Sequence, residues 1–180
     1  MIKRIDRKLV HKGSILDIYS DTMELDNGNL ETWDMVHHRM AASCTVCVTE
    51  DGHIALCRQY RPALERYTWE LPAGCRDSVD EDFMDCAKRE LLEESGYKSD
   101  RWSHLLSLRS TVAFCDERIE VFLAEDAVLV SGQSLDQAED ISIRLFDVDE
   151  LLNMIYSGEL QDSKTVSGIL AYVSKNGGKS

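Results

Sequence analysis

One helical segment between strand-forming stretches limits the folds open to this chain. The segment "KRELLEESGY", residues 88–97, carries Glu90, Glu93 and Glu94 just before Gly96. Glycine commonly follows the last turn of a helix, so we expect the helix to end there. Strands precede, flank and follow this helix, which predicts an α/β fold with a mixed sheet and helices packed on it.

The surrounding pattern predicts hairpins first and helices last. Asn-Gly and Asp-Gly turns separate the early strands, and such turns favour hairpins. The expected strands are residues 14–25, 30–38, 43–50, 53–60, 67–74, 104–110, 118–130 and 140–148. Ser78 or Asp80 is the expected cap of the central helix, which runs to Ser95. Two further helices are expected over residues 149–158 and 163–175.

The three glutamates share one side of the helix. A helix turns about 100° per residue, so Glu93 lies about 60° to one side of Glu90 and Glu94 about 40° to the other. Glu94 also projects within about 20° of Phe83 and Ala87, which belong to the apolar face. A solvated acidic face would lie opposite the core, so the position of Glu94 calls for another explanation.

Acids at this end of a helix are electrostatically unfavourable. The helix dipole disfavours negative charge near the C-terminus, and neighbouring carboxylates repel one another. A hard divalent cation such as Mg²⁺ would relieve both effects. Arg89 stands four residues before Glu93 and can pair with it. On spacing alone, a metal cage and an ordinary acidic helix end both remain open.

The charge balance narrows the classes of partner. The formal net charge is -13, which disfavours nucleic acid because phosphate backbones are bound by clustered Lys and Arg. The sequence contains no run of eighteen apolar residues, so no membrane span is predicted. The start "MIKRIDRKLV" has no apolar stretch of the kind found in signal peptides. We therefore expect a cytoplasmic protein without nucleic-acid or membrane partners.

The six cysteines do not form a zinc motif. Cys44 and Cys47 are spaced as a Cys-x-x-Cys pair, but no second pair follows at zinc-site spacing. Their segment reads as a strand, where residues three apart face opposite sides. We interpret the cysteines as buried thiols in a reducing compartment.

Residues 74–97, "GCRDSVDEDFMDCAKRELLEESGY", resemble the Nudix box, G-x5-E-x7-R-E-U-x-E-E-x-G-U, in which U is a bulky apolar residue. From Glu81 onward the match is complete. The matching positions are Glu81, Arg89, Glu90, Leu91, Glu93, Glu94, Gly96 and Tyr97. One departure precedes them, since six residues rather than five separate Gly74 from Glu81. Either the loop carries an extra residue, or Asp80 takes the role of the first glutamate.

The Nudix resemblance implies an α/β/α sandwich that hydrolyses a nucleoside diphosphate linked to another moiety. It also implies a divalent metal, Mg²⁺ with Mn²⁺ as an alternative, as cofactor. By position, Glu90 and Glu94 are the implied principal metal ligands. Glu93 either joins them or supports them through Arg89. The backbone carbonyl of Ala73 or Gly74 is a further implied ligand.

The flanks resemble the ADP-sugar pyrophosphatase branch of that family, especially the ADP-ribose pyrophosphatases. Residues 58–74, 114–126 and 158–173 look like the strands, loop and C-terminal helix of the branch. Residues 1–42 look like its dimerising β-hairpin extension, and residues 43–180 like the Nudix domain itself. The resemblance therefore implies a homodimer that acts on a small nucleoside diphosphate substrate.

The same resemblance suggests four substrate contacts. Trp33 is expected to stack on a nucleobase, although a single Trp is more often a packing residue. Arg61 is expected to hold the diphosphate or terminal ribose, with a surface cation as the alternative. Glu70 is expected to bond a ribose hydroxyl or to form a structural salt bridge. Glu117 is expected to anchor its loop or to contact the substrate.

The implied catalytic base lies in the acidic loop "SGQSLDQAEDISI", residues 131–143. Glu139 is the best match, with Asp140 beside it, and a solvated acidic loop is the alternative for either residue. A second departure concerns Val112 and Ala113, which stand where the branch has Pro and Gly. The backbone preferences of valine and alanine differ from those of proline and glycine, so this departure bears on substrate choice more than on hydrolysis.

The sequence therefore predicts a metal-dependent Nudix hydrolase of ADP-ribose or a related nucleoside diphosphate sugar. Within the class, GDP-mannose or a dinucleotide coenzyme is the alternative substrate. Outside it, the alternative is a Nudix-like nucleotide-binding regulator without catalysis.

Overall fold

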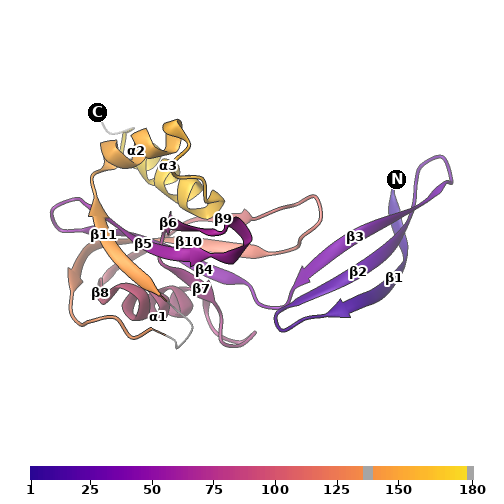
Figure 1. The fold of residues 1–180 in the computed structure, drawn as a ribbon, viewed down its shortest axis with the longest axis horizontal. Helices are drawn as coiled ribbons and strands as arrows, with labels where there is room; N and C mark the ends of the chain where they lie inside the picture. The colour runs from indigo at the N-terminus through magenta and orange to yellow at the C-terminus, as the bar shows by residue number, and fades with distance from the viewer. Residues whose placement is uncertain (136–139, 178–180) are drawn as a thin grey trace.

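The computed structural model describes residues 1–135 and 140–177, whose strands form two separate sheets (Figure 1). The smaller, antiparallel sheet consists of β1 (Lys3–Lys12), β2 (Leu16–Glu24) and β3 (Leu30–His38). The sequence predicted only a hairpin here, and that prediction was incomplete because β1 adds a third strand. Every residue of β1 is exposed, and its sequence does not show the alternation of apolar and polar residues that marks a half-buried strand.

An eight-stranded mixed sheet forms the body of the molecule. Its order is β11-β5-β4-β10-β8, with β6 added to β5, β7 to β4 and β9 to β10. The strands are β4 (Ala42–Thr49), β5 (Ile54–Arg61), β6 (Arg66–Glu70), β7 (Ala73–Cys75), β8 (Tyr97–Lys98), β9 (Arg101–Arg109), β10 (Arg118–Leu129) and β11 (Ile141–Phe146). β10 runs parallel to β4, whereas β4 pairs antiparallel with β5 and β7.

Helices cover both faces of this sheet, with α1 on one side and α2 and α3 on the other (Figure 1). They are α1 (Phe83–Ser95), α2 (Val148–Ser157) and α3 (Ser163–Gly177), and a short 3₁₀ turn spans Pro62–Leu64. The main core joins Leu56 of the sheet to Leu151 and Ile169 of the covering helices. A smaller cluster joins Ala55 to Leu91 of α1. The predicted α/β/α sandwich is thus confirmed.

The ends of α1 explain where its acids lie. Asp82 caps the helix, and its carboxylate accepts a hydrogen bond of 2.8 Å from a first-turn N–H. The sequence placed this cap at Ser78 or Asp80, which was wrong, since both lie in the loop before the helix. Gly96 ends the helix as predicted, in the left-handed region at φ 73° that favours glycine.

Two composition-based expectations can be compared with the fold. All six cysteines are free, and Cys44, Cys47, Cys57 and Cys86 are buried as expected. The expectation was wrong for Cys75 and Cys115, which are only half-buried. Of the helices in the described ranges, none has both the length and the apolar character needed to cross a bilayer.

Candidate active site

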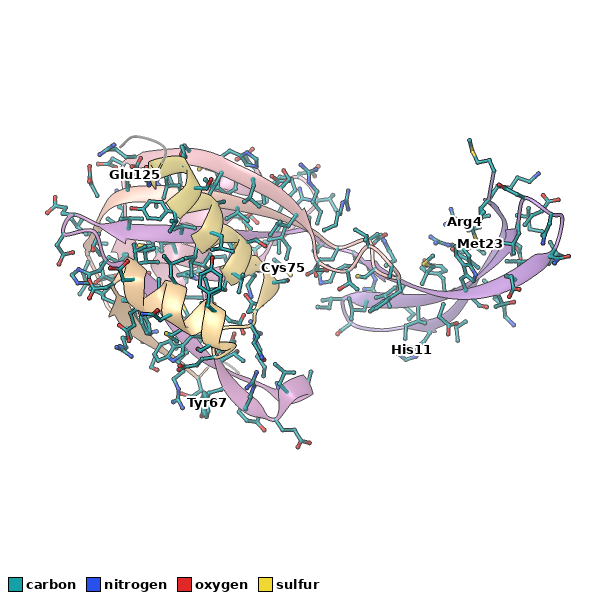
Figure 2. All side chains as sticks on the ribbon, turned by 90° about the horizontal axis from the view of Figure 1, so that it is seen from above. Arg4, His11, Met23, Tyr67, Cys75 and Glu125 are labelled. Carbon is teal, nitrogen blue, oxygen red and sulfur yellow. The ribbon has the colours of Figure 1, made fainter. Side chains whose placement is uncertain are left out.

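The last turns of α1 lie beside β7, the short strand that precedes the helix in the chain. Cys75 ends β7, and Figure 2 shows it on the side of the body nearer the N-terminal sheet. Glu90, Glu93 and Glu94 are carried on this part of α1. The strand, the loop and the helix of the predicted box therefore meet at one place.

Glu94 is buried, with 5% of its surface exposed. Its Oε2 accepts a hydrogen bond of 2.8 Å from the Ala73 N–H, and the Sγ of Cys57 lies 3.6 Å from the same oxygen. Glu94 therefore lies on the apolar side of α1, as predicted, because it turns toward the sheet rather than toward water. The backbone of Ala73 contributes an N–H to this arrangement, whereas the sequence drew attention to a carbonyl.

Glu90 packs against the backbone of Gly74. A Cβ atom at residue 74 would lie only 2.2 Å from the Glu90 carboxylate, so glycine is needed for this close approach. The glycine at the start of the box thus has a steric role, and it brings a carboxylate to the strand-loop junction.

Arg89 connects the acids of the box. Its guanidinium donates to Glu81 at 3.0 Å, to Glu90 at 2.7 Å and to Glu93 at 3.2 Å. It also donates to the Cys75 carbonyl at 3.1 Å, which ties the helix to β7. The pairing of Arg89 with Glu93 four residues on was predicted and is confirmed.

These contacts also shift the ionisation of the pair formed by Arg89 and Glu81. Hydrogen bonding to Glu81 raises the pKa of Arg89 above its ordinary value, although partial burial works against it. The same hydrogen bond lowers the pKa of the Glu81 carboxyl. Both groups are therefore held in their charged forms.

The longer loop between Gly74 and Glu81 is closed on itself. Oε2 of Glu81 accepts a hydrogen bond of 2.7 Å from the Asp77 N–H, and Arg76 donates to the Glu81 carbonyl at 3.2 Å. Glu81, and not Asp80, therefore occupies the first glutamate position, and the extra residue is absorbed in the loop.

Arg61 and Glu70 form a second charged group on neighbouring strands. Arg61 donates twice to the Glu70 carboxylate, through Nε and one terminal nitrogen, each at 2.6 Å. Lys164 of α3 donates to the same carboxylate and to Asp162. Lys164 was missed in the sequence because residues 94 positions apart meet here only through the fold.

The Glu70 carboxyl is strongly acidic in this setting. Burial alone would raise its pKa, but the hydrogen bonds and charges of Arg61 and Lys164 outweigh burial and lower the pKa to about 2. The salt bridge considered for Glu70 in the sequence is therefore present. This pair borders a cavity of about 490 Å³.

The loop predicted to hold the catalytic base is hydrogen-bonded to the end of α1 and to the start of β11. The Ser134 N–H donates to the Glu93 carbonyl at 2.8 Å. The side-chain amide of Gln133 donates to the Glu94 carbonyl at 2.6 Å and to the Ile141 carbonyl at 3.1 Å. Glu139 itself lies outside the described residues. Gln133, which the sequence did not single out, lies in this loop and joins the end of α1 to the start of β11.

Comparison with known proteins decides the family. Residues 37–167 match the NUDIX domain family, a range that covers more than half of the chain and includes the whole box. The chain belongs to the Nudix family. An ADP-ribose pyrophosphatase of Bacillus subtilis is 32% identical over 168 residues, which cover 93% of this chain and 90% of that protein. An ADP-ribose pyrophosphatase of Mycobacterium tuberculosis is 30% identical over 93% of this chain and 81% of that protein.

A solved structure shares the architecture. A crystal structure of an ADP compounds hydrolase superposes with a TM-score of 0.87, covering 99% of this chain and 95% of that chain at 19% identity. The superposition includes the N-terminal sheet, so this extension is part of the shared fold.

The Nudix box of this chain suits a hard divalent cation. It borders a cavity of about 430 Å³ that is lined by Ala73, Gly74, Cys75, Arg76, Asp77, Arg89, Glu90, Glu93, Ser134 and Leu135. Within the described ranges, no three acidic, histidine or cysteine side chains are gathered as a metal cage. Arg89 instead draws Glu90 and Glu93 onto its guanidinium. Carboxylate oxygens beside a glycine that leaves them room are a donor set that fits Mg²⁺.

The remaining two predicted substrate residues differ in their distance from the Nudix box. Burial, and after it the charge of Glu117, raises the pKa of Cys75 in β7, so Glu117 lies near the box, whereas Trp33 lies away from the Nudix helix in the single chain. Trp33 is on β3, within the N-terminal sheet that stands apart from α1 (Figure 1). Glu117 lies where the loop before β10 meets that sheet, with its Oε1 3.8 Å from Nε2 of His38. The Val36 N–H donates to the Phe114 carbonyl at 2.7 Å, which docks this loop on β3.

Proposed function

We propose that this Nudix protein hydrolyses the pyrophosphate bond of ADP-ribose or a related nucleoside diphosphate sugar. The products are a nucleoside monophosphate and a sugar phosphate. The observation that carries the proposal is the pair of carboxylates, Glu90 and Glu94, seated on the backbone of Gly74 and Ala73. The similarity to two ADP-ribose pyrophosphatases over nearly the whole chain supports the choice of substrate.

Mg²⁺ is the proposed cofactor, and Mn²⁺ is a possible substitute. Glu90, Glu94 and Glu93, together with the Ala73 carbonyl, would hold it, and Arg89 would orient Glu93 and Glu90. A bound divalent cation neutralises the diphosphate and lowers the pKa of a bound water.

The chain itself supplies the proton transfer and the binding. Glu139 is the proposed base that takes a proton from the attacking water. The water oxygen bonds to one phosphorus as the bridging P–O bond breaks, and the bridging oxygen leaves with the other phosphoryl group. Arg61 and Glu70 are the proposed contacts for the phosphate or ribose, and their mutual pairing pre-orients both side chains.

A homodimer is part of the proposal, with residues 1–42 as its interface and residues 43–180 as the Nudix domain. In one chain Trp33 lies on a sheet apart from α1, so its proposed stacking on a nucleobase needs a second copy. Glu117, at the junction of the sheet and the body, is the proposed link between that interface and the site.

Product analysis tests the proposal. Purified protein is incubated with Mg²⁺ and ADP-ribose, GDP-mannose or a dinucleotide coenzyme, and the phosphate products are separated by chromatography. We expect ADP-ribose to be cleaved fastest. Faster cleavage of another compound in the panel would make that compound the assigned substrate. A folded protein that cleaves none of them would support a ligand-binding regulator instead.

A matched pair of variants assigns the reaction to the box. Glu94→Gln should lower turnover by roughly 10³-fold, because metal-assisted charge stabilisation amounts to several kcal/mol. Asp85→Asn changes an exposed acid on the same helix and should leave turnover unchanged. Equal turnover in the two variants would remove Glu94 from the mechanism.

A further inference from the structure

Cys57 is a buried thiol on β5 that the proposed mechanism does not use. Its exposed fraction is 3%, and its Sγ lies 3.6 Å from Oε2 of Glu94. The two residues are 37 positions apart in the chain. A core thiol is usually an apolar filler, but this one contacts a carboxylate proposed to bind the metal.

The direction of the hydrogen bond follows from the chemistry of the two groups. A thiol donates its proton and a carboxylate oxygen accepts, so Sγ of Cys57 donates to Oε2 of Glu94. The Ala73 N–H donates to the same oxygen at 2.8 Å. Two donors, one from β5 and one from β7, therefore converge on one oxygen of Glu94.

The neighbours of Cys57 leave Glu94 as the acceptor for its proton. Cys57 also stands opposite Glu70 in the pairing of β5 with β6. Both oxygens of Glu70 already accept from Arg61, and Lys164 adds a further donor. The thiol is thus placed between two carboxylates, and Arg61 and Lys164 donate to the oxygens of Glu70.

We propose that Cys57 is a positioning residue that fixes the rotation of the Glu94 carboxylate for metal binding. The inference rests on the proposed function, in which Glu94 is a ligand. Groups that hold a metal ligand by hydrogen bonds raise metal affinity because they remove the freedom of the ligand to turn. A thiol does so in a buried position without adding a second charge.

Direct metal binding tests this role without relying on turnover. Mn²⁺ binding to the protein alone is measured by electron paramagnetic resonance for wild type, Cys57→Ala, Cys57→Ser and Cys47→Ala. Cys57→Ala should weaken Mn²⁺ binding by about tenfold, as for other groups that support metal ligands. Cys57→Ser retains a donor and should recover most of the affinity.

Cys47→Ala is the matched control, since Cys47 is a fully buried thiol on the adjacent strand and, among the described residues, makes no hydrogen bond to a carboxylate of the site. It should reduce thermal stability as Cys57→Ala does, yet bind Mn²⁺ as wild type does. Equal binding by Cys57→Ala and Cys47→Ala would overturn the inference, as would a Cys57→Ser protein no better than Cys57→Ala.

A metal-free measurement examines the hydrogen bond itself. The difference in infrared absorption between wild type and Cys57→Ala isolates the S–H stretching band of Cys57. We expect a band shifted to low frequency, and a return toward the ordinary frequency in Glu94→Gln. An unshifted band would overturn the inference. If wild type bound no Mn²⁺ and cleaved no substrate, both the proposed function and this inference would be overturned. A change confined to Cys57→Ala bears on the role of Cys57 alone.

Discussion

At the scale of single residues, the site depends on close backbone approaches more than on the acids alone. Glu94 is held by an N–H of β7, and Glu90 fits only because residue 74 has no side chain. The acids and their facing direction could be predicted from helical angles. The role of Gly74 as a cradle could not, because it depends on a contact across the loop and helix.

Gly74→Ala tests this cradle. The added Cβ would lie 2.2 Å from the Glu90 carboxylate, so that carboxylate must move. We expect turnover at fixed Mg²⁺ to fall by about 10²-fold, the cost of misplacing a site group by roughly 1 Å. Gly132→Ala is the control, since nothing lies within 4 Å of its Cβ position. Steady-state kinetics that show equal rates for both variants would contradict the cradle.

Glu70 gives a prediction for stability against pH. Its pKa is lowered to about 2 in the fold, from an ordinary value of 4.5. A lowered pKa means that its contribution is complete above about pH 4.5 and disappears as the pH falls through about 2. At neutral pH, Glu70→Gln should lower the free energy of unfolding by roughly 3 kcal/mol, because Arg61 and Lys164 lose their shared acceptor.

Urea denaturation at a series of pH values measures this effect. The difference in unfolding free energy between wild type and Glu70→Gln should shrink as the pH falls from 5 toward 2. Glu159→Gln, an exposed acid bordering the same cavity, should give a small difference throughout. A Glu70→Gln difference that stays constant down to pH 2 would mean that the salt bridge does not set the pKa.

At the scale of elements, local patterns predicted most helices and strands. The hairpin around Asp51 and Gly52 forms, and Gly52 adopts φ 86° in its turn. β1 escaped detection because its ten residues are all exposed and show no alternation. The helix cap was misplaced because Ser78, Asp80 and Asp82 are all suitable residues, and only the folded loop selects among them.

Contacts between side chains of different elements could not be predicted from the sequence patterns. Lys164 reaches Glu70 across 94 residues, and Cys57 reaches Glu94 across 37. Neither contact leaves a local signature, since spacing reports only which side of one element a residue occupies. The resemblance to the Nudix box identified the acids, and the fold identified the groups that hold them.

At the scale of the whole molecule, the N-terminal sheet is the part that one chain leaves unfinished. It projects from the body in both views (Figures 1 and 2). Its exposed apolar side chains are Ile2, Ile5, Leu9, Val10, Ile15, Leu16, Ile18, Leu30 and Trp33. Small sheets are stable when an apolar face is covered, and these exposed side chains are the reason we propose a partner surface for this sheet.

The proposed partner is a second copy of the chain, and light scattering tests it. At micromolar concentration the protein should scatter with twice the mass of one chain. Replacing two exposed apolar residues, as in Leu9→Lys with Ile18→Lys, should shift the mass toward one chain. Wild-type protein that is monomeric at this concentration would contradict the dimer and, with it, the stacking role of Trp33.

The carboxylates of α1 are proposed to hold the divalent cation, and Mn²⁺ binding tests this assignment without requiring a substrate. Bound Mn²⁺ per chain is counted by electron paramagnetic resonance for wild type and for the double variant Glu90→Gln with Glu94→Gln, with circular dichroism to confirm folding. We predict saturable binding to wild type and its loss in the folded double variant. A folded double variant that binds Mn²⁺ as tightly as wild type would show that Glu90 and Glu94 do not hold the cation.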